Sequence, residues 1–447
     1  LYALSKEVDQ IVPIYILDPK QKIGSVSKWW LEQSLKNLTE NIEKKNGKLN
    51  IFVGNPSDII QSLILNKNIK CFYWNRLYDP YSISRDKKIK SLLKLADIDC
   101  GTFNGYLLNE PWEIKNKSGS FFKVFTPYWR HCNEITRNKK FKKKTQNLKF
   151  YNLNLKNSEN IEDLNLTNKK LKWTDKIHNH WLPGENNAKL QLQEFINKKA
   201  DNYSIGRDRP DLNLTSKLSP HLHFGEISPI EIYNQVSLSK KIKSQNKEKF
   251  LAEIGWRDFS YNLLYYYPAM TNNPIQNKFN KFPWLKDNKN LKKWQKGLTG
   301  IPIVDAGMRE LYSTGWMHNR VRMIVGSFLV KHLLINWSEG EKFFKNCLLD
   351  YNEANNVSGW QWVAGCGADA APYFRIFNPI LQGEKFDKEG NYVKKWLPEL
   401  SNVPKKFIHK PWELKDESIL KLDKDYPSPI VSHEKARAKA LNAFKKI

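Results

Sequence analysis

The spacing of apolar residues changes part-way along the chain, and this change most constrains the fold. Residues 1–130 alternate short apolar runs, such as 11–17, with amphipathic segments, such as 27–45. Such alternation is typical of βαβ units and predicts a parallel sheet flanked by helices. From about Lys189 onward the apolar spacing is helical and strand-like runs are few. The sequence therefore predicts an α/β domain followed by a large all-α domain.

A polar stretch separates the two patterns. Residues 138–173 are rich in Lys and Asn and lack sustained periodicity, so we expect a linker that wraps a surface. The expected organisation is an α/β domain over 1–130, a linker over 131–188 and a helical domain over 189–447. No strand precedes the first apolar run, so the Rossmann-like parallel sheet is expected to lack its first strand.

Charge, hydropathy and cysteine content narrow the class of protein. Lys and Arg exceed Asp and Glu by 27 (73 against 46), which favours a polyanionic partner, although an AT-rich genome would explain part of the excess. The longest apolar run is broken by Lys331 and His332, so no membrane span is expected. Five widely spaced cysteines argue against disulfides and zinc and for a reducing compartment. His221 and His223 lack metal-ligand neighbours and are expected to be structural.

A Ser-Pro pair follows a small polar stretch near the start of the helical pattern. Ser219 is expected to cap a helix in which Pro220 is the first residue. Thr215, Ser216 and Lys217 offer hydroxyls, backbone N–H groups and a cation, which suit a phosphate at a helix N-terminus. Most capped helices bind no anion, so an ordinary cap is the alternative.

Charged side chains lie among aromatic ones in the helical run 250–268. Glu253, Trp256 and Arg257 fall at i, i+3 and i+4 and are expected to share one face. A solvated ion pair is the usual explanation of such charges. A face that combines carboxylate, indole and guanidinium better suits a stacked, hydrogen-bonding ligand.

The run 315–337 is expected to form one long helix. Its polar side chains need partners if they are buried, and a polar ligand or a carboxylate such as Asp350 would serve. One stripe of this helix carries Trp316, Arg320 and Met323, with Asn319 and Arg322 beside it.

The segment that begins at Asn356 combines two tryptophans with a glycine-rich run. Residues 365–370 match G-x-G-x-x-A, and Glu384 falls roughly where a ribose-binding acid would stand. No strand precedes the match, so a dinucleotide fingerprint is not expected. Small residues here would instead let the backbone approach a flat ligand. If Trp360 and Trp362 are helical, they point about 200° apart and face different partners.

Five blocks, in this order, resemble the photolyase/cryptochrome family and, within it, the CPD (cyclobutane pyrimidine dimer) photolyases. They are TSKLSPHLHFGEISP, WRDF, WQKGLTGIPIVDAGMRELYSTGWMHNR, GWQWVAGCGADAAPYFRIFNP and QGEKFD. The resemblance covers essentially the whole chain. It implies an α/β antenna domain joined by a long loop to an all-helical domain that holds FAD. It also implies that FAD, in its reduced anionic form, passes an electron under blue light to a pyrimidine dimer flipped out of DNA.

The resemblance assigns two groups of residues to FAD. The group expected along the phosphates and ribityl chain is Tyr203, Thr215, Ser216, Lys217, Leu218 and Ser219. The group expected around the flavin ring is Arg257, Asn319, Arg322, Asp350, Asn352 and Asn356, with Asn356 near N5 and Arg322 paired to Asp350. Family members often have an acid where this chain has Asn352, which weakens that expected contact.

The resemblance also implies a lesion pocket and an electron route. The residues expected at the dimer are Glu253, Trp256, Asn319, Arg320, Met323 and Trp362, with Arg207 on a DNA phosphate. The tryptophans expected to photoreduce the flavin from the surface are Trp360, Trp337 and Trp284. Among these residues, the catalytic set is expected to be Trp284, Trp337, Trp360, Asn356 and Glu253.

Particular positions favour repair over signalling. In (6–4) photolyases and animal cryptochromes, the positions of Asn319 and Met323 look like His. Plant cryptochromes lack the tryptophans at Trp256 and Trp362 and have Asp in place of Asn356. A cryptochrome photoreceptor without repair activity is the alternative. An ordinary FAD oxidoreductase would need an acid/base and a nicotinamide site, and neither is evident.

The antenna and the cellular setting complete the expectations. An antenna chromophore of folate or deazaflavin type is considered, but Tyr81 and Ser82 do not match residues that would bind folate. Trp29 and Trp30 could stack a pterin or could belong to the core. The protein is expected to act as a monomer on DNA that contains pyrimidine dimers, without metal or membrane. The expected compartment is the cytoplasm, at the nucleoid if the source is bacterial.

Overall fold

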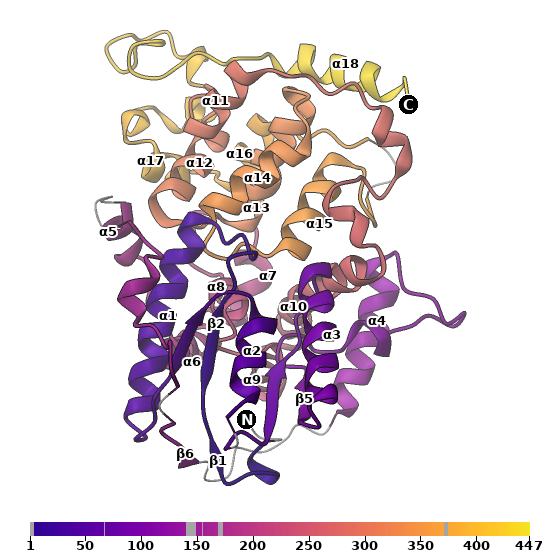
Figure 1. The fold of residues 1–447 in the computed structure, drawn as a ribbon. Coiled ribbons are helices and arrows are strands. Elements are labelled where there is room, and N and C mark those ends of the chain that lie inside the picture. Colours follow the sequence, from indigo (N-terminus) through magenta and orange to yellow (C-terminus); the bar gives the residue numbers. More distant parts are fainter. Residues whose placement is uncertain (1–3, 67, 140–148, 154, 169–172, 371–373) are drawn as a thin grey trace.

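The N-terminal part is a parallel α/β layer, seen at the bottom of Figure 1. The computed structural model describes residues 4–66, 68–139, 149–153, 155–168, 173–370 and 374–447. The strands form three parallel pairs, β1 with β6, β2 with β3 and β4 with β5. Their bounds are Gln10–Ile11 (β1), Ile14–Leu17 (β2), Asn50–Val53 (β3), Cys71–Asn75 (β4), Asp99–Phe103 (β5) and Lys149–Phe150 (β6). The accompanying helices are Ser25–Glu43 (α1), Pro56–Ile64 (α2), Pro80–Leu95 (α3) and Phe125–Asn138 (α4).

The first apolar run differs from the single strand that was predicted. It is divided into β1 and β2, which pair with different partners, and Pro13 lies between them. Proline has no backbone N–H to donate to a strand ladder, which accounts for the break.

Part of the range predicted as linker packs on this layer. β6 pairs with β1, and Glu159 forms an isolated bridge with Ile51. Leu155 and Ile161 are buried in the cores of the α/β layer. The helix α4 crosses the predicted boundary at residue 130, so the domain limits remain predictions.

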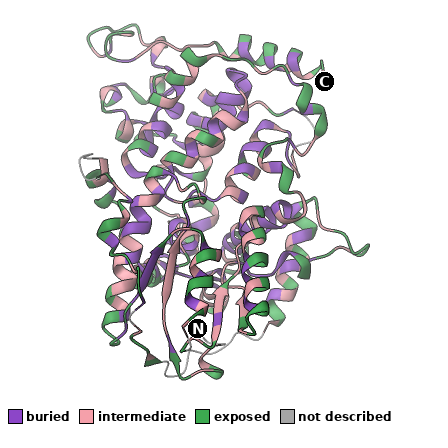
Figure 2. Ribbon diagram, viewed as in Figure 1, coloured by how far each residue is buried: buried purple, intermediate pink, exposed green. Residues whose placement is uncertain are grey.

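From residue 173 onward the described part of the chain is mainly helical, and its central helices bury their inner faces (Figure 2). The helices here are α5 (Trp173–His178), α6 (Glu185–Glu194), α7 (Tyr203–Gly206), α8 (Ser219–His223), α9 (Pro229–Leu238), α10 (Ser244–Tyr266), α11 (Asn288–Lys296), α12 (Pro302–Thr314), α13 (Asn319–Ser327), α14 (Trp337–Cys347), α15 (Glu353–Ala364), α16 (Pro379–Phe386), α17 (Asn391–Trp396) and α18 (His433–Phe444). The predicted combination of a parallel-sheet domain and a large helical domain is confirmed. The two layers are joined by contacts such as the bond from Ser27 Oγ to the Leu348 carbonyl at 2.8 Å.

The sequence predicted one long helix over 315–337, and this prediction is wrong. The side chain of His318 accepts a bond from Arg320 N at 3.2 Å and so caps α13. A π-helical turn follows α13, and Leu334 then has a φ of 54°, which ends the helical path. Trp316 therefore precedes the helix and does not share its stripe.

The predicted cap at Ser219 is also wrong. Ser219 is the first residue of α8, the N-cap position is Leu218, and no side chain caps the helix. The hydroxyl of Ser219 instead accepts a bond from Trp316 Nε1 at 3.3 Å. A tertiary contact has replaced the local one.

The glycine-rich run is not preceded by a strand, as predicted. α15 ends at Ala364, and Gly365, with a φ of 85°, terminates the helix in the left-handed conformation. A helix therefore precedes the G-x-G-x-x-A match where a dinucleotide fingerprint requires a strand.

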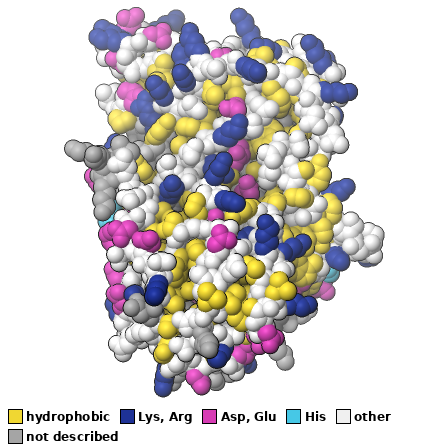
Figure 3. Space-filling view, in the orientation of Figure 1, with side chains coloured by type: hydrophobic (Ala, Val, Ile, Leu, Met, Phe, Trp, Pro, Cys, Tyr) yellow, Lys and Arg dark blue, Asp and Glu magenta, His cyan; other side chains and the backbone are white. Residues whose placement is uncertain are grey.

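Within the described ranges, no helix is both long and apolar enough to cross a membrane. The same residues hold no cluster of His, Cys, Asp and Glu suited to a metal ion. In Figure 3, Lys and Arg side chains are spread over the visible face, with acidic side chains among them. The net charge thus does not by itself mark one binding surface in this view.

Candidate functional site

Arg257, on α10, lies in a buried aromatic setting. The residue is 9% exposed, its Nη1 donates to the carbonyl of Tyr106, and its guanidinium lies 4.3 Å from the ring of Tyr106 and 5.4 Å from that of Tyr261. Its Nη2 has no hydrogen-bond partner among the described residues. Buried donors are normally bonded, so this nitrogen can serve a polar group that is brought to the site.

The predicted ion pair between Arg322 and Asp350 is present. Arg322 Nη2 lies 3.0 and 2.9 Å from the two carboxylate oxygens, and its Nε donates to the carbonyl of Met317 at 2.8 Å. The side chain of Asp350 is only 4% exposed. Contacts at both Nε and Nη2 leave the guanidinium little freedom to turn.

Asn352, at a position where family members often have an acid, makes contacts that the sequence did not predict. Its Oδ1 accepts from the backbone N–H of Asn355 at 3.1 Å, which caps α15. Its Nδ2 donates to the hydroxyls of Tyr261 and Tyr106. An amide both accepts and donates, so one side chain joins the helix cap to the two tyrosines that contact Arg257.

Asn356 is held by a carboxylate that sequence reasoning missed. Its Nδ2 donates to Glu341 Oε1 at 3.2 Å and to the Glu341 carbonyl at 3.4 Å. The hydroxyl of Tyr351 donates to the same Oε1 at 2.7 Å. Glu341 lies on α14 outside every motif that drew attention, so only the fold reveals this contact.

The polar stretch before α8 adopts an unusual backbone at Lys217. Its φ is 53°, and its Nζ lies 5.9 Å from the ring of Trp181 and 5.6 Å from that of Trp316. Burial lowers the pKa of Lys217. The ammonium is therefore aimed at two indoles, and its predicted contact with a phosphate stays a prediction.

The other residues predicted along the cofactor phosphates differ in exposure. Tyr203 is buried, with its ring against Phe195 and Phe250. Leu218 is buried as well, whereas Thr215, Ser216 and Ser219 are half-buried. Ser216 Oγ accepts from the N–H of Leu218 at 3.4 Å, and its carbonyl accepts from Gln191 Nε2 at 2.9 Å.

Two histidines, one half-buried and one buried, add buried ring nitrogens near the ion pair. His223 Nδ1 and His318 Nε2 have no partner in the described part of the chain. Burial lowers the pKa of His223 to about 4 and that of His318 to about 3, so both rings are neutral near pH 7. Together with Arg257 Nη2, they provide the buried hydrogen-bonding capacity that a large heteroaromatic ligand requires.

Two further ion pairs involve residues that the sequence assigned to DNA. Arg207 Nη1 lies 2.6 Å from Glu253 Oε1, and Arg320 Nη2 lies 2.7 Å from Asp208 Oδ1. Burial raises the pKa of Glu253, and the Arg207 guanidinium opposes that rise. The Arg320 guanidinium also lies 4.4 Å from the ring of Phe386. On the same helix as Arg320, Asn319 is exposed and Met323 is half-buried.

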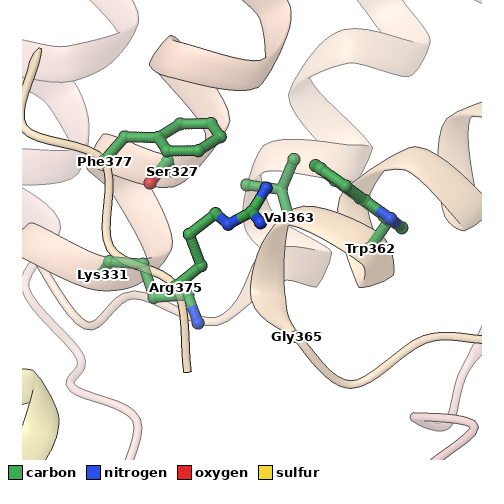
Figure 4. A pocket seen from close by; sticks show the side chains of 7 residues that line it. All are labelled: Ser327, Lys331, Trp362, Val363, Gly365, Arg375 and Phe377. Carbon is green, nitrogen blue, oxygen red and sulfur yellow. The ribbon is translucent and has the colours of Figure 1, made fainter. Parts of the chain in front are cut away.

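The two indoles assigned to the lesion belong to different helices. Trp256, on α10, stacks on Phe125 with ring centroids 3.7 Å apart and planes 9° apart. Trp362, on α15, donates from Nε1 to the carbonyl of Asp369 at 3.2 Å. Figure 4 shows Trp362 at one side of a pocket that Lys331 and Arg375 also line.

Comparisons with known proteins place the chain. Residues 1–147 match the family model described as DNA photolyase, and residues 250–446 match the one described as the FAD binding domain of DNA photolyase. The deoxyribodipyrimidine photo-lyase of Agrobacterium fabrum is 42% identical over 97% of this chain and 92% of its own length. The chain belongs to the photolyase/cryptochrome family. It therefore contains an FAD-binding domain.

Two further comparisons bear on the type of family member. The crystal structure of a class III photolyase from Agrobacterium tumefaciens superposes with a TM-score of 0.94 at 41% identity and covers 99% of this chain and 93% of that one. Cryptochrome-2 of Arabidopsis thaliana is 35% identical over 97% of this chain and 74% of its own length. Both photolyases and a cryptochrome are thus similar to this chain.

The two neighbouring tryptophans of α15 face different partners, as the helical spacing predicted. Trp360 is 4% exposed and packs against Phe344 (5.1 Å) and Trp294 (6.2 Å). It fills space that Gly340 leaves, because a Cβ on Gly340 would lie 2.2 Å from Trp360 Cη2. Trp362 instead faces the pocket.

The other two tryptophans of the predicted electron route are placed at different depths. Trp337 is buried at the start of α14, and Trp284 is half-buried with its ring 4.4 Å from that of Phe282. Trp294, which touches Trp360, was not predicted. The order of this electron route within a photolyase/cryptochrome protein stays a prediction here.

The first tryptophan pair belongs to the core. Trp29 and Trp30 are 3% and 0% exposed, and Trp30 Nε1 donates to Glu226 Oε1 at 3.0 Å. Glu226 Oε2 in turn lies 2.5 Å from His221 Nδ1, so His221 has the structural role that was expected. Of the two interpretations of the pair, core packing is the one observed. At the position considered for folate, Tyr81 bonds to Asp18 Oδ2 at 2.5 Å, and the antenna chromophore stays a prediction.

Proposed function

We propose that this member of the photolyase/cryptochrome family repairs cyclobutane pyrimidine dimers in DNA under blue light. The observation that carries the proposal is the placement of two indoles, Trp256 and Trp362, on helices that pack together and also carry Arg257 and Asn356. An indole offers a flat face to a base, and stacking on aromatic side chains is the usual means of holding an extruded nucleotide.

The polar residues would hold FAD beneath this pair of indoles. Arg257 and the Arg322–Asp350 pair would lie at the flavin ring, with Asn356 anchored by Glu341. When bound, FAD in its reduced anionic form supplies the light-driven electron that opens the dimer ring. A guanidinium and amides beside the ring favour its negative charge. The unsatisfied Nη2 of Arg257 supports this arrangement.

The charged residues at the outer edge would bind the DNA backbone and the lesion. Arg207 and Arg320 already sit opposite carboxylates, Glu253 and Asp208. A DNA phosphate that takes over Arg207 would release Glu253 to bond the polar edge of the dimer. The ion pair would then act as a placeholder for the two contacts that DNA supplies.

Repair can be tested directly with the flavin-loaded protein. An oligonucleotide with one dimer is incubated with the reduced protein in the dark and under blue light, and the loss of the dimer is followed by chromatography. We expect loss only in the light. A protein that binds reduced FAD but leaves the dimer intact would instead be a photoreceptor, as the similarity to cryptochromes allows.

The remaining parts of the proposal concern its setting. We expect a monomer, because each proposed contact with FAD and DNA comes from a single chain. The expected location is the cytoplasm, at the nucleoid in a bacterium, where the DNA is. Size-exclusion chromatography with light scattering tests the first expectation.

A further inference from the structure

Phe125 covers one face of Trp256. The two rings are nearly parallel, 9° apart, with centroids at 3.7 Å, and Phe125 is buried. Phe259 meets Trp256 edge-on at 5.8 Å and Phe125 at 5.9 Å. The indole is therefore held from one face and from one edge. A base can stack only on the opposite face of Trp256.

Asp369 connects the same phenylalanine to the other indole. Phe125 is the first residue of α4, where a helix leaves its backbone N–H groups without internal partners. This N–H donates to Asp369 Oδ2 at 3.4 Å, and the carbonyl of Asp369 accepts from Trp362 Nε1 at 3.2 Å. Asp369 has a φ of 52°, a conformation that Asp tolerates better than most residues.

These contacts form one path from α10 to α15. It runs from Trp256 through the ring and the N–H of Phe125 to the side chain of Asp369, and then from its carbonyl to Trp362. We propose that Phe125 and Asp369 are positioning residues that set the separation and tilt of the two indoles that receive the dimer. This inference rests on the proposed function, because it assigns the lesion to Trp256 and Trp362.

The path also assigns part of the lesion pocket to the N-terminal half. Phe125 lies within the residues that match the N-terminal family model, 1–147, whereas both indoles and Asp369 lie within 250–446. The N-terminal half thus forms the α/β layer and also supplies Phe125, the ring that backs one indole of the proposed pocket.

Two substitutions test the path. Asp369→Gly suits the left-handed backbone but removes the acceptor, and Phe125→Leu keeps an apolar side chain but removes the stacked ring. Loss of the hydrogen bond should weaken binding of a dimer-containing oligonucleotide about five- to tenfold. Loss of the ring pair should weaken it about two- to tenfold. Affinity for the undamaged oligonucleotide and the FAD absorbance spectrum should not change.

Matched variants separate positioning from a general loss of structure. Asp369→Asn keeps an acceptor oxygen and should restore most of the affinity. Asp423→Gly removes another side-chain acceptor at positive φ, in an exposed loop that bonds Ser428, and should leave the affinity unchanged. Phe121→Leu removes a ring stacked on Tyr266 at 5.1 Å and serves as the control for Phe125→Leu.

The combination of the two substitutions gives the sharpest result. If Phe125 and Asp369 act on one path, the double variant should lose clearly less than the product of the two single losses. Full multiplication, or wild-type discrimination between damaged and undamaged DNA in both single variants, overturns the inference. A wild-type protein that binds dimers selectively but does not repair them overturns the proposed repair and leaves this inference standing.

Discussion

Arg207 and Glu253 are bound to each other, with 2.6 Å between Nη1 and Oε1, although the sequence assigned one to a DNA phosphate and the other to the lesion. Both assignments hold if bound DNA separates the pair, so that a phosphate contacts Arg207 and the dimer contacts Glu253. Arg207→Ala should weaken binding of damaged and undamaged DNA to a similar degree and reduce the salt slope by about one. Glu253→Gln should weaken only the damaged duplex. Binding titrations at several salt concentrations measure both effects, and equal losses for the two variants on both duplexes would contradict the division.

The two tryptophans of α15 should separate lesion binding from photoreduction. Trp362→Ala is expected to weaken binding of dimer-containing DNA by about 1–3 kcal/mol, the usual cost of a lost base stack. Trp360→Phe should leave that binding near normal, because Trp360 lies in the core, and should slow reduction of FAD by light. Fluorescence anisotropy and absorbance under illumination report the two properties. Identical behaviour of the variants would show that the two indoles share one task.

Gly340 should be intolerant of any side chain. A Cβ there would lie 2.2 Å from Trp360 Cη2 and 2.6 Å from Cζ2 and Cζ3, so Gly340→Ala should lower the free energy of unfolding by about 1–3 kcal/mol. These atoms belong to the outer ring of the indole, and the single ring of phenylalanine does not reach as far from Cβ. Adding Trp360→Phe to Gly340→Ala should therefore recover part of the loss in chemical denaturation. A double variant that is less stable than both single variants would rule out this contact as the cause.

Buried histidines should make the protein sensitive to mild acid. Burial lowers the pKa of His332 from 6.5 to about 3, and His223 and His318 are lowered similarly. Below about pH 6.5 these histidines bind protons in the unfolded chain but not in the folded protein. The free energy of unfolding therefore falls as the pH falls from 6.5 toward 3. Each ring contributes about 1.4 kcal/mol per pH unit in that window.

Substitution of His332 isolates one of these contributions. His332 stacks on Phe328 at 5.0 Å and bonds His433 Nδ1 at 2.9 Å, away from the proposed FAD contacts. His332→Leu should be less stable than the wild type near neutral pH because that bond is lost. Its stability should fall less steeply with acid. Denaturant titrations at about pH 7 and pH 5 measure the slope, and an unchanged slope would mean that His332 does not titrate on unfolding.

Much of the fold could be predicted because its signals are local. Each signal lies within one segment of the sequence: the helical spacing of apolar residues in α1, α2 and α3, and the apolar runs of β3 and β4. The pairing of β1 with β6 is not, because its partners are more than a hundred residues apart and β6 lies in a polar stretch. Pro13 marks the break between β1 and β2 but does not say with which strand each half will pair.

The site divides in the same way. The resemblance to the photolyase/cryptochrome family led to the Arg322–Asp350 pair, although neither residue falls in the five blocks quoted for it. The resemblance assigned no role to Glu341 or Phe125. Glu341 contacts Asn356 on the next helix, and Phe125 contacts Trp256 far along the chain, so the packing of the helices is needed to reveal either contact. The cap expected at Ser219 failed for a related reason: a local rule lost to a tertiary bond with Trp316.

The ring of Phe125 against Trp256 also limits how this protein could be divided or recombined. A fragment that begins after α4 would keep both indoles but lose the backing of one of them. Exchange of the N-terminal half with that of a relative would alter lesion discrimination even though every residue at the dimer stayed the same. The useful crossover point therefore lies before Phe125, so that α4 stays in the half that carries both indoles.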